Sequence, residues 1–405
     1  MIKQIPASKL IVGMHVHDLD CSWLDHPFMR NNFKVISEEQ IQKILDAKIK
    51  ALYIDTDKGL DATQPKKAPD KKDSTITYFA DAQQNEPRRT SLKLELSRAA
   101  NINKAALQAV ANILEDAREG RPISLDMANL VVDDMVSSAI RNSDALLGLT
   151  CIRKIDNYTL EHSVGVSVLL ITFGKYIGLS REELIDIGIG GLLHDIGKAL
   201  SPPSILNKPG RLNPNEYKII QKHVDFSHDL AADIAEISET TLQVITEHHE
   251  RIDGSGYPNQ AAGDNISLYG QMAAIADFFD AITTDRVYSE SISQPAALKK
   301  LMDWGKAKFN QELVQRFIHC VGIYPIGSLV ALSNGCFAVV IESSQKGLLL
   351  PKIRIIFDSI KRQFIEPRDV DLANQTEDPQ LSIVSTVDAK KWRIRPEEYM
   401  DFYNY

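Results

Sequence analysis

The chain has 405 residues, a length that predicts two or three domains rather than a single core. Hydrophobic residues make up 44% and charged residues 25%, as in ordinary soluble globular proteins, and no apolar run reaches the ~18 residues of a membrane span. A net charge of −8 argues against broad binding to DNA or RNA, although a few local cations are sufficient to hold a small phosphorylated ligand. We therefore expect a cytoplasmic protein that binds neither a membrane nor a nucleic-acid polymer.

The first part of the chain predicts a small α+β domain over residues 1–60. The stretches KLIVGMHVHDLD, from Lys9, and ALYIDTD, from Ala51, are typical of strands, and SEEQIQKILDAKI between them predicts a helix. Ser37 and Gln40 have the spacing of a capping box at the start of this helix. Residues 61–90 are rich in Lys, Asp, Pro, Gln and Thr, and this composition predicts a polar, partly disordered linker.

Residues 91–323 predict a helical domain that begins with a long helix. Apolar residues recur every three or four positions in LKLELSRAANINKAALQAVANILEDA and in MANLVVDDMVSSAIRNSDALLGL. The period changes in residues 324–405, where SLVAL, FAVVIES and KIRIIF predict strands and Ser333-Asn334-Gly335 predicts a hairpin turn. The predicted fold class is mainly α: a helical bundle with a small α+β domain before it and a short β-rich region after it.

Six of the ten histidines lie between residues 162 and 249, and five of these six are candidate ligands, each on or at the end of a predicted helix. They are His162, His194, His223, His248 and His249, and two aspartates accompany them, Asp195 directly after His194 and Asp277 in the apolar helix QMAAIADFFDAITTDR. Any one of these histidines alone is more often a hydrogen-bonded core or surface residue than a ligand. Together, the His-Asp and His-His doublets predict two adjacent metal ions, bridged by an aspartate and capped by imidazoles.

The ligand types narrow the choice of metal. A mixed nitrogen and oxygen set without thiolate favours iron, manganese or another divalent transition metal over a structural zinc. The ligand set does not exclude nickel or zinc as the ion found in a purified sample.

The stretch GIGGLLHDIGK carries two further signals. Gly188, Gly190 and Gly191 each cost a helix up to ~1 kcal/mol relative to alanine, which predicts that other helices pack closely here; a helix end or a bend is the alternative. Lys198 lies four residues after His194, on the same side one turn on. It is predicted to direct a cation at a bound anion, with a solvated surface lysine as the alternative.

These motifs occur together and in order. HDIGK, the isolated His223, EHHERIDGSGYP and DFFDAITTDR resemble the HD-GYP family, a branch of the HD superfamily of metal-dependent phosphohydrolases. The resemblance covers about residues 156–323, and IPASKLIVGMHVHDLD and WLDHPF resemble a domain of unknown function often fused ahead of it. The resemblance implies an HD-type helical bundle that hydrolyses cyclic dinucleotides, chiefly cyclic di-GMP, to pGpG, with GMP as a further product left open.

The resemblance also implies roles for individual residues. The implied metal ligands are His162, His194, Asp195, His223, His248, His249 and Asp277, with Asp195 as the bridge. Lys198 matches the lysine that contacts the scissile phosphate, so Asp195 and Lys198 are the expected catalytic residues. Tyr257 and Arg286 match substrate contacts, and Gly256 is expected to line the substrate entrance. Glu250 is expected to support the metal ligands.

Two departures from the family pattern carry predictions. Tyr158 stands where three-metal members carry a glutamate, so two ions are expected, and Ser289 replaces a basic residue that other members use for substrate. Asp277 and Arg286 are expected on one helix, nine residues or roughly 13–14 Å apart, which places Arg286 near the distal part of a dinucleotide.

Other functions are kept open. One is hydrolysis of a different nucleotide or an alarmone, which the GYP loop disfavours, and another is hydrolysis of a mixed GMP-AMP cyclic dinucleotide. A third, of a different class, is a cyclic-dinucleotide sensor or interaction platform with a weak metal site. The flanking domains suit a regulated protein that forms a homodimer or binds a signalling partner.

Overall fold

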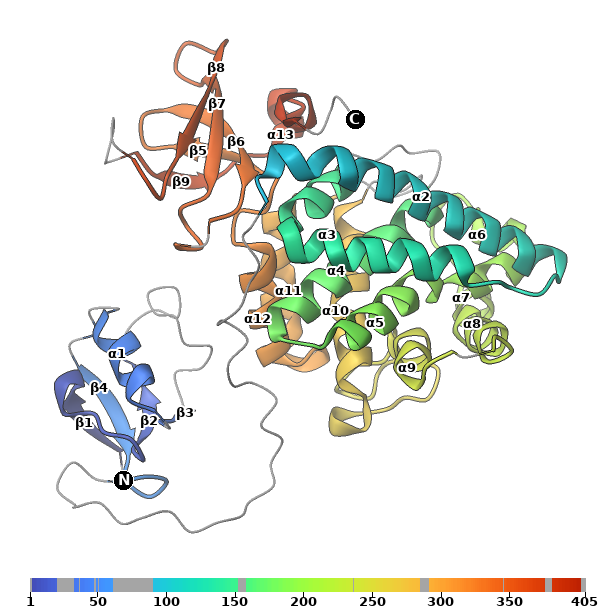
Figure 1. Ribbon diagram of the computed structural model, residues 1–405, viewed down its shortest axis with the longest axis horizontal. Coiled ribbons are helices and arrows are strands. Elements are labelled where there is room, and N and C mark those ends of the chain that lie inside the picture. The colour runs from blue at the N-terminus through green and yellow to red at the C-terminus, as the bar shows by residue number, and fades with distance from the viewer. Residues whose placement is uncertain are drawn as a thin grey trace. The chain divides into compact units, whose positions relative to one another are not determined.

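The computed structural model describes residues 2–19, 33–35, 37–46, 49, 51–60, 90–151, 158–235, 237–284, 291–344, 346–375 and 381–401. The chain divides into two compact units, Met1–Thr77 and Tyr78–Tyr405. The fold class is mainly α as predicted, with one antiparallel sheet in each unit (Figure 1). Within the described ranges, no helix is long and apolar enough to cross a membrane. The predicted domain boundaries at residues 60, 90 and 323 stay predictions.

The first unit is a small sheet with one helix. Its strands lie in the order β1-β4-β2-β3. The elements are β1 (Ile2–Pro6), the 3-10 helix η1 (Ala7–Lys9), β2 (His15–Asp18), β3 (Phe33–Lys34), α1 (Glu38–Asp46) and β4 (Ala51–Asp55). The strand predicted from Lys9 is wrong over its first half, because Gly13 takes a φ of +101° and the strand begins only at His15. The Gln40 amide donates to Ser37 Oγ at 3.3 Å, which is one half of the predicted capping box.

The second unit is a helical bundle followed by a sheet. The helical elements are α2 (Leu92–Glu119), α3 (Asp126–Thr150), α4 (Tyr158–Ile177), α5 (Arg181–Leu193), η3 (Ile196–Leu200), α6 (Pro203–Leu206), α7 (Pro214–Gln221), α8 (His223–Ala232), α9 (Glu239–Glu247), η4 (Gly263–Asn265), α10 (Leu268–Thr283), α11 (Gln294–Lys308) and α12 (Gln311–Val321). Both long helices predicted at its start are confirmed as α2 and α3, which pack against each other. Most side chains of α4 and α10 are buried, so these helices lie inside the bundle.

The glycines of α5 let its neighbours approach closely, as predicted. A Cβ at Gly191 would lie 2.6 Å from the Cα of Ser167 in α4, and one at Gly190 would lie 2.7 Å from the Cβ of Val244 in α9. Gly188 faces side chains at a similarly short distance. Glycine at these positions lowers helix propensity, but the missing side chains let α4, α5 and α9 pack closely. The candidate site lies where these helices meet.

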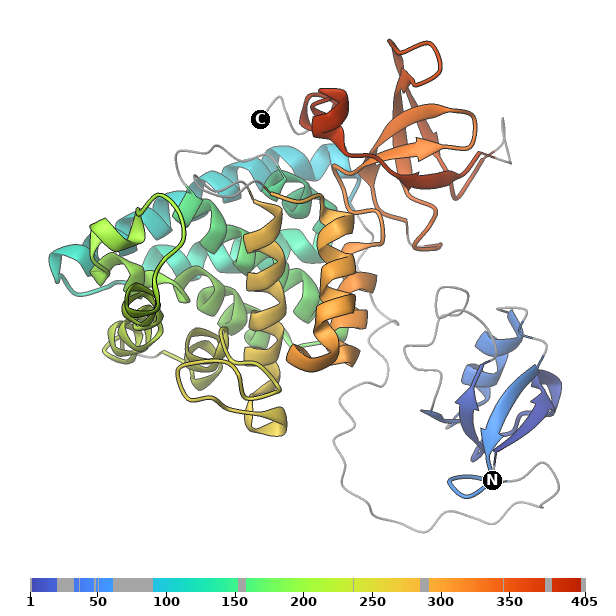
Figure 2. The same cartoon turned by 180° about the vertical axis from the view of Figure 1, so that it is seen from behind.

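The C-terminal sheet has the order β8-β7-β6-β5-β9 and lies at one end of the bundle (Figure 2). Its elements are β5 (Leu329–Leu332), β6 (Cys336–Glu342), β7 (Lys352–Asp358), β8 (Gln363–Asp371) and β9 (Ile383–Thr386), followed by α13 (Ala389–Trp392) and η5 (Pro396–Tyr399). The three predicted strands and the hairpin between β5 and β6 are confirmed. Strands β8 and β9 escaped prediction because most of their side chains are exposed and show no apolar alternation. The Ser343 hydroxyl donates to Asp144 in α3 at 2.8 Å and ties the sheet to the bundle.

One expected helix is shorter than predicted. Helix α10 ends at Thr283, and Thr284 is extended, so the expectation that Asp277 and Arg286 share one helix is wrong. The hydroxyls of Thr283 and Thr284 donate to the carbonyl oxygens of Phe279 and Asp280 at 2.8 and 2.9 Å. Such side-chain bonds compete with the helix backbone, and two consecutive β-branched residues favour the extended conformation that follows. Arg286 itself lies outside the described residues, so its distance from Asp277 stays a prediction.

Candidate metal centre

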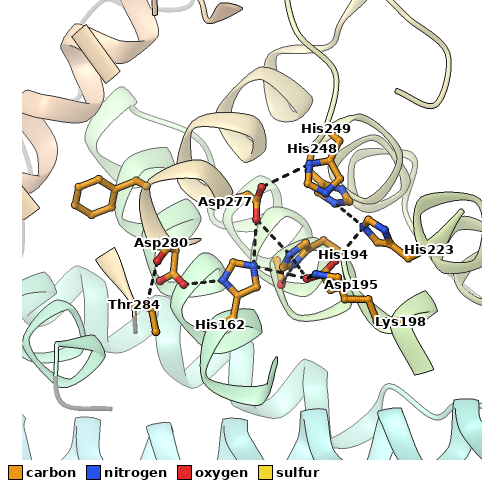
Figure 3. Close-up of polar contacts among 12 residues, drawn as sticks. His162, His194, Asp195, Lys198, His223, His248, His249, Asp277, Asp280 and Thr284 are labelled. Carbon is orange, nitrogen blue, oxygen red and sulfur yellow. Dashed lines mark hydrogen bonds and ion pairs between the residues drawn. The ribbon is translucent and has the colours of Figure 1, made fainter. Parts of the chain in front are cut away.

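The seven predicted ligands lie together inside the bundle (Figure 3). His162 lies in α4, His194 and Asp195 follow α5, His223 begins α8, His248 and His249 follow α9, and Asp277 lies in α10. Six of the seven are at most 6% exposed, and the seventh, His249, has a side chain that is 18% exposed. So many buried polar groups cost free energy unless partners satisfy them, and this cost indicates a functional site.

Local features of the chain bring these residues together. A capping box between Ser180 and Glu183 starts α5, the helix that ends at His194, and the Tyr269 hydroxyl of α10 donates to Glu183 at 2.6 Å. Directly after the His-Asp doublet, a Cβ at Gly197 would lie 2.1 Å from the carbonyl oxygen of His223. Only glycine therefore lets α8 come close enough to place His223 beside the doublet.

The imidazoles are oriented by hydrogen bonds on one nitrogen. The Nδ1 atoms of His194, His223 and His248 lie 2.9, 2.7 and 2.7 Å from the carbonyl oxygen three residues earlier in the chain. A carbonyl oxygen only accepts, so each Nδ1 carries the proton and donates it. Each Nε2 is then left with a lone pair, the form in which histidine binds a metal.

The donor atoms fall into two groups with one aspartate between them. His162, His194 and Asp277 bring donor atoms within 4.8 Å of one another, and so do His223, His248 and His249. Asp195 Oδ2 lies 3.2 Å from His194 Nε2, while Asp195 Oδ1 lies 3.1 Å from His223 Nε2. The two carboxylate oxygens of Asp195 therefore face the two groups (Figure 3).

The spacing of these atoms fits a metal better than a hydrogen-bond network. His194 Nε2 and Asp195 Oδ1 are buried without a hydrogen-bond partner among the described residues, and the Nε2 atoms of His223 and His248 face each other at 3.5 Å. Ligand atoms about 2.1 Å from a tetrahedral or octahedral ion lie about 3.0–3.4 Å apart, close to the distances seen here. The cluster is therefore a metal site of the kind typical of HD domains.

The charges of the site favour bound cations. Burial raises the pKa of Asp195, but Lys198 and His194 outweigh it and hold that pKa well below its usual range. Burial likewise raises the pKa of Asp277, and the hydrogen bond from His162 outweighs it, so that this pKa also lies well below its usual range. Both carboxylates are therefore charged at neutral pH.

The histidines differ in the charged groups around them. Burial and neighbouring imidazoles lower the pKa of His248 and of His249 well below the usual value, which keeps both neutral and able to bind a metal. Burial also lowers the pKa of His162, but the carboxylates of Asp277 and Asp280 outweigh it and raise this pKa to about 9. The two acidic neighbours of His162 thus attract positive charge to this part of the site.

Asp280 is a site residue that the sequence motifs do not identify. It is 1% exposed, and its Oδ2 accepts a hydrogen bond from His162 Nδ1 at 2.7 Å. Its position three residues after Asp277 in DFFD places both carboxylates on one side of α10, and this spacing is the signal that could have found it. Tyr158, which stands where three-metal members carry a glutamate, stacks its ring on His162 with centroids 5.5 Å apart.

The predicted substrate-binding residues lie at the edge of the cluster. Lys198 is 22% exposed and its ammonium pairs with Asp195, while the ring of Tyr257 lies 4.6 Å from that of His249. Burial raises the pKa of Tyr257, so its hydroxyl stays protonated. Gly256 packs against the backbone of Glu250, where a Cβ would lie 2.5 Å from the Cα. Arg286 and Ser289 lie outside the described residues.

Glu250 has different partners from those expected. The sequence predicts that it supports the metal ligands, but its carboxylate accepts hydrogen bonds from the backbone amides of Asn259 and Ala261. It therefore holds the loop that follows the histidine pair rather than the imidazoles.

Known proteins resemble this chain in sequence along nearly all of its length. Residues 2–128 match a family described as a domain of unknown function, DUF3391, and residues 134–313 match the HD domain. Cyclic di-GMP phosphodiesterase PA4108 of Pseudomonas aeruginosa is 36% identical over 398 residues, 98% of this chain and 94% of that protein. The 3′3′-cGAMP-specific phosphodiesterase 2 of Vibrio cholerae is 37% identical over 158 residues, 39% of this chain and 30% of that protein.

Among solved structures, Bd1817, an HDG"Y"P protein from Bdellovibrio bacteriovorus, matches with a TM-score of 0.47 and 18% sequence identity. The match covers 78% of this chain and 98% of that one.

The helical bundle and the buried cluster of histidines and aspartates define a metal-dependent phosphohydrolase of the HD superfamily. With the EHHERIDGSGYP motif and a full-length relative such as PA4108, the chain belongs to the HD-GYP family.

Proposed function

We propose that this protein hydrolyses cyclic di-GMP to pGpG at two divalent metal ions in the buried cluster. The division of the donor atoms into two groups on either side of Asp195 is the observation that carries the proposal. The near full-length similarity to a protein named as a cyclic di-GMP phosphodiesterase supports the choice of substrate. The nitrogen and oxygen donors, without thiolate, favour iron or manganese.

Each group of donors holds one ion in this proposal. His162, His194 and Asp277 hold the first, the three histidines His223, His248 and His249 hold the second, and Asp195 joins them. Bound there, two divalent ions neutralise the charge of the phosphodiester and lower the pKa of a water molecule to near neutrality.

The chain's own residues complete the reaction. Hydrolysis forms a bond between phosphorus and the oxygen of water, breaks the bond from phosphorus to the 3′ oxygen, and delivers a proton to that oxygen. The Lys198 ammonium lies beside Asp195 and stabilises the negative charge that grows on the phosphate during attack. Tyr257 lies against His249 at the exposed edge of the cluster and lines the entrance for the nucleotide.

A second substrate is a mixed GMP-AMP cyclic dinucleotide. The observation in its favour is the 37% identity to a 3′3′-cGAMP-specific phosphodiesterase over 158 residues. The two substrates differ in one base and share the phosphodiester, so the metal ligands do not discriminate between them. Selection between them rests on contacts with the bases.

One experiment tests the proposal directly. Freshly purified protein is analysed for metal, and its products from cyclic di-GMP and from 3′3′-cGAMP are separated by chromatography. We expect two ions per chain and pGpG as the first product. Three fully occupied ions would contradict the two-ion site, and metal-loaded protein without any product would favour the sensor function instead.

A substitution links the ions to the activity. Asp195→Ala should remove at least one ion and lower the rate by roughly a thousandfold or more, because both donor groups lose their shared carboxylate. Asp229→Ala, at a side chain that is 79% exposed, is the matched control and should change neither quantity. Full metal content and full activity in Asp195→Ala would refute the assignment.

A further inference from the structure

The glutamate after the histidine pair is buried among backbone amides. Glu250 is 1% exposed; its Oε1 accepts from the Asn259 amide at 2.7 Å and its Oε2 accepts from the Ala261 amide at 3.1 Å. In the part of the chain that the structure describes, no cation forms an ion pair with this carboxylate. Loop amides are thus its hydrogen-bond donors, and bonds to a charged acceptor are about twice as strong as neutral ones.

The same loop, residues 253–261, touches the histidine turn at a second place. The Tyr257 amide lies 3.3 Å from the His249 carbonyl oxygen and donates to it. A Cβ at Gly256 would lie 2.5 Å from the Cα of Glu250, so the two backbones are in contact there. The loop is therefore held by Glu250 beyond Tyr257 and by direct backbone contact at Gly256 and Tyr257.

We propose that Glu250 is a positioning residue for the substrate: it fixes the loop of residues 253–261 so that Tyr257 stands over the metal centre where a cyclic dinucleotide binds. The inference rests on the proposed function for its substrate. The ring of Tyr257 lies 4.6 Å from that of His249 and tilts by 34° against it. This placement depends on the loop, because His249 directly precedes Glu250 and Tyr257 lies two residues before Asn259, so the Glu250 hydrogen bonds join the two segments that carry these rings.

The glutamate before the histidine pair does a different task. Glu247 Oε2 accepts from the backbone amide of Ser267 at 2.9 Å and from its hydroxyl at 2.5 Å, at the start of α10. Helix α10 carries Asp277, so Glu247 holds an element of the metal cluster. Glu250 thus supports the loop on the substrate side of the site, and Glu247 supports the helix that carries a metal ligand. Substitutions of the two glutamates can therefore be compared within one protein.

The first test needs no substrate. Hydrogen exchange of the amides in residues 251–262 is measured in the metal-loaded protein. In Glu250→Ala the amides of Asn259 and Ala261 should exchange roughly tenfold faster or more, because both lose a charged acceptor. Glu250→Gln keeps one acceptor oxygen and should give a smaller increase. Glu239→Gln, at an exposed side chain at the start of α9, is the control and should leave the exchange unchanged.

The second test separates binding from chemistry. In Glu250→Ala we expect the KM for cyclic di-GMP to rise about tenfold, while kcat, metal content and hydrolysis of bis(p-nitrophenyl) phosphate stay within about threefold. Glu247→Ala should instead lower metal content and affect both substrates together. A loss of metal and an equal loss on both substrates in Glu250→Ala and Glu250→Gln would overturn the inference, as would unchanged exchange.

The outcomes distinguish the two proposals. If the wild-type protein hydrolyses neither cyclic dinucleotide, the proposed function fails, whereas the exchange measurement still reports whether Glu250 holds the loop. If the wild-type protein is active and exchange in Glu250→Ala is unchanged, the inference about Glu250 fails and the proposed function stands.

Discussion

The orientation of His162 depends on a residue of another helix. Its Nδ1 donates to Asp280 in α10 at 2.7 Å, while its Nε2 lies 3.1 Å from Asp277 Oδ1 (Figure 3). A carboxylate behind a metal-binding imidazole fixes the ring and raises its basicity. Asp280 is therefore a positioning residue for the metal centre. His162 is correctly oriented only when α4 and α10 pack so that the two side chains meet.

We expect Asp280→Ala to weaken metal binding by about 10- to 100-fold, because His162 loses the group that orients it. Asp280→Asn should lose less, since its amide oxygen still accepts a hydrogen bond. Competition of the metal-free protein with a coloured chelator measures the affinity, and Asp303→Asn, at an exposed side chain in α11, serves as control. Unchanged affinity in Asp280→Ala would show that the Asp280 contact is dispensable.

At the scale of single residues, the metal ligands are easier to predict from sequence than the groups that support them. The His-Asp and His-His doublets have a spacing that few other functions require, so the doublets by themselves indicate a metal site. Asp280 and Glu250 are single carboxylates, and their partners lie 118 and up to 11 residues away. Only the folded backbone determines which group each carboxylate faces.

The helices of the bundle meet at glycines, and α5 shows what this requires. A Cβ at Gly191 would lie 2.6 Å from the Cα and 2.8 Å from the amide nitrogen of Ser167 in α4. Backbone atoms cannot rotate away, so the two helices would have to separate. Ser167 lies five residues after His162 on the same helix, and such a separation would therefore reach the metal cluster.

Gly191→Ala should lower the free energy of unfolding by roughly 1–3 kcal/mol, the usual cost of overpacking, and reduce metal content as well. Urea unfolding of the metal-free protein and metal analysis measure the two effects. Gly263→Ala is the comparison, because no heavy atom of the described residues, its chain neighbours apart, lies within 4 Å of its Cβ position while its φ is +54°. It reports the cost of a side chain in the left-handed region alone, about 1–2 kcal/mol, and should leave metal content unchanged. If Gly191→Ala kept full metal content, the close approach of α4 and α5 would not govern the site.

Elements with strong periodicity are predictable from sequence and weakly patterned ones are not. Apolar spacing identifies α2 and α3, whereas β8 and β9 expose most side chains and carry little pattern to detect. The predicted end of α10 is wrong because the hydroxyls of Thr283 and Thr284 bond to the helix carbonyls, a local competition that apolar spacing does not reveal.

At the scale of the whole molecule, α2 belongs to the unit that carries the site. The match to DUF3391 extends to residue 128 and so includes α2, yet α2 packs against α3, α4 and η3, the 3-10 helix that contains Lys198. Buried Glu95 of α2 accepts hydrogen bonds from Arg141 and Ser138 of α3. Burial raises the pKa of Glu95, but these hydrogen bonds outweigh it and lower the pKa, so the carboxylate stays charged in its pair.

Truncated proteins distinguish the end of the DUF3391 match at residue 128 from the end of the first compact unit at Thr77. A protein of residues 90–405 should fold, bind metal and hydrolyse substrate as the full chain does, because Met1–Thr77 is a compact unit of its own. A protein of residues 129–405 lacks α2 and leaves Arg141 without its buried partner, so it should unfold at lower urea concentration and hold less metal. Equal stability of the two truncated proteins would show that α2 belongs functionally with the N-terminal unit.

Three of the metal-site histidines are oriented by hydrogen bonds within their own segment of the chain. His194, His223 and His248 each donate to a carbonyl three residues earlier, so four consecutive residues set both the tautomer and the direction of the ring. Loops between these segments can therefore lengthen or shorten over evolutionary time without turning an imidazole away from the ions. His162 instead donates its Nδ1 proton to Asp280 of another helix. Of these four histidines, His162 is therefore the one whose orientation is most sensitive to a shift between α4 and α10.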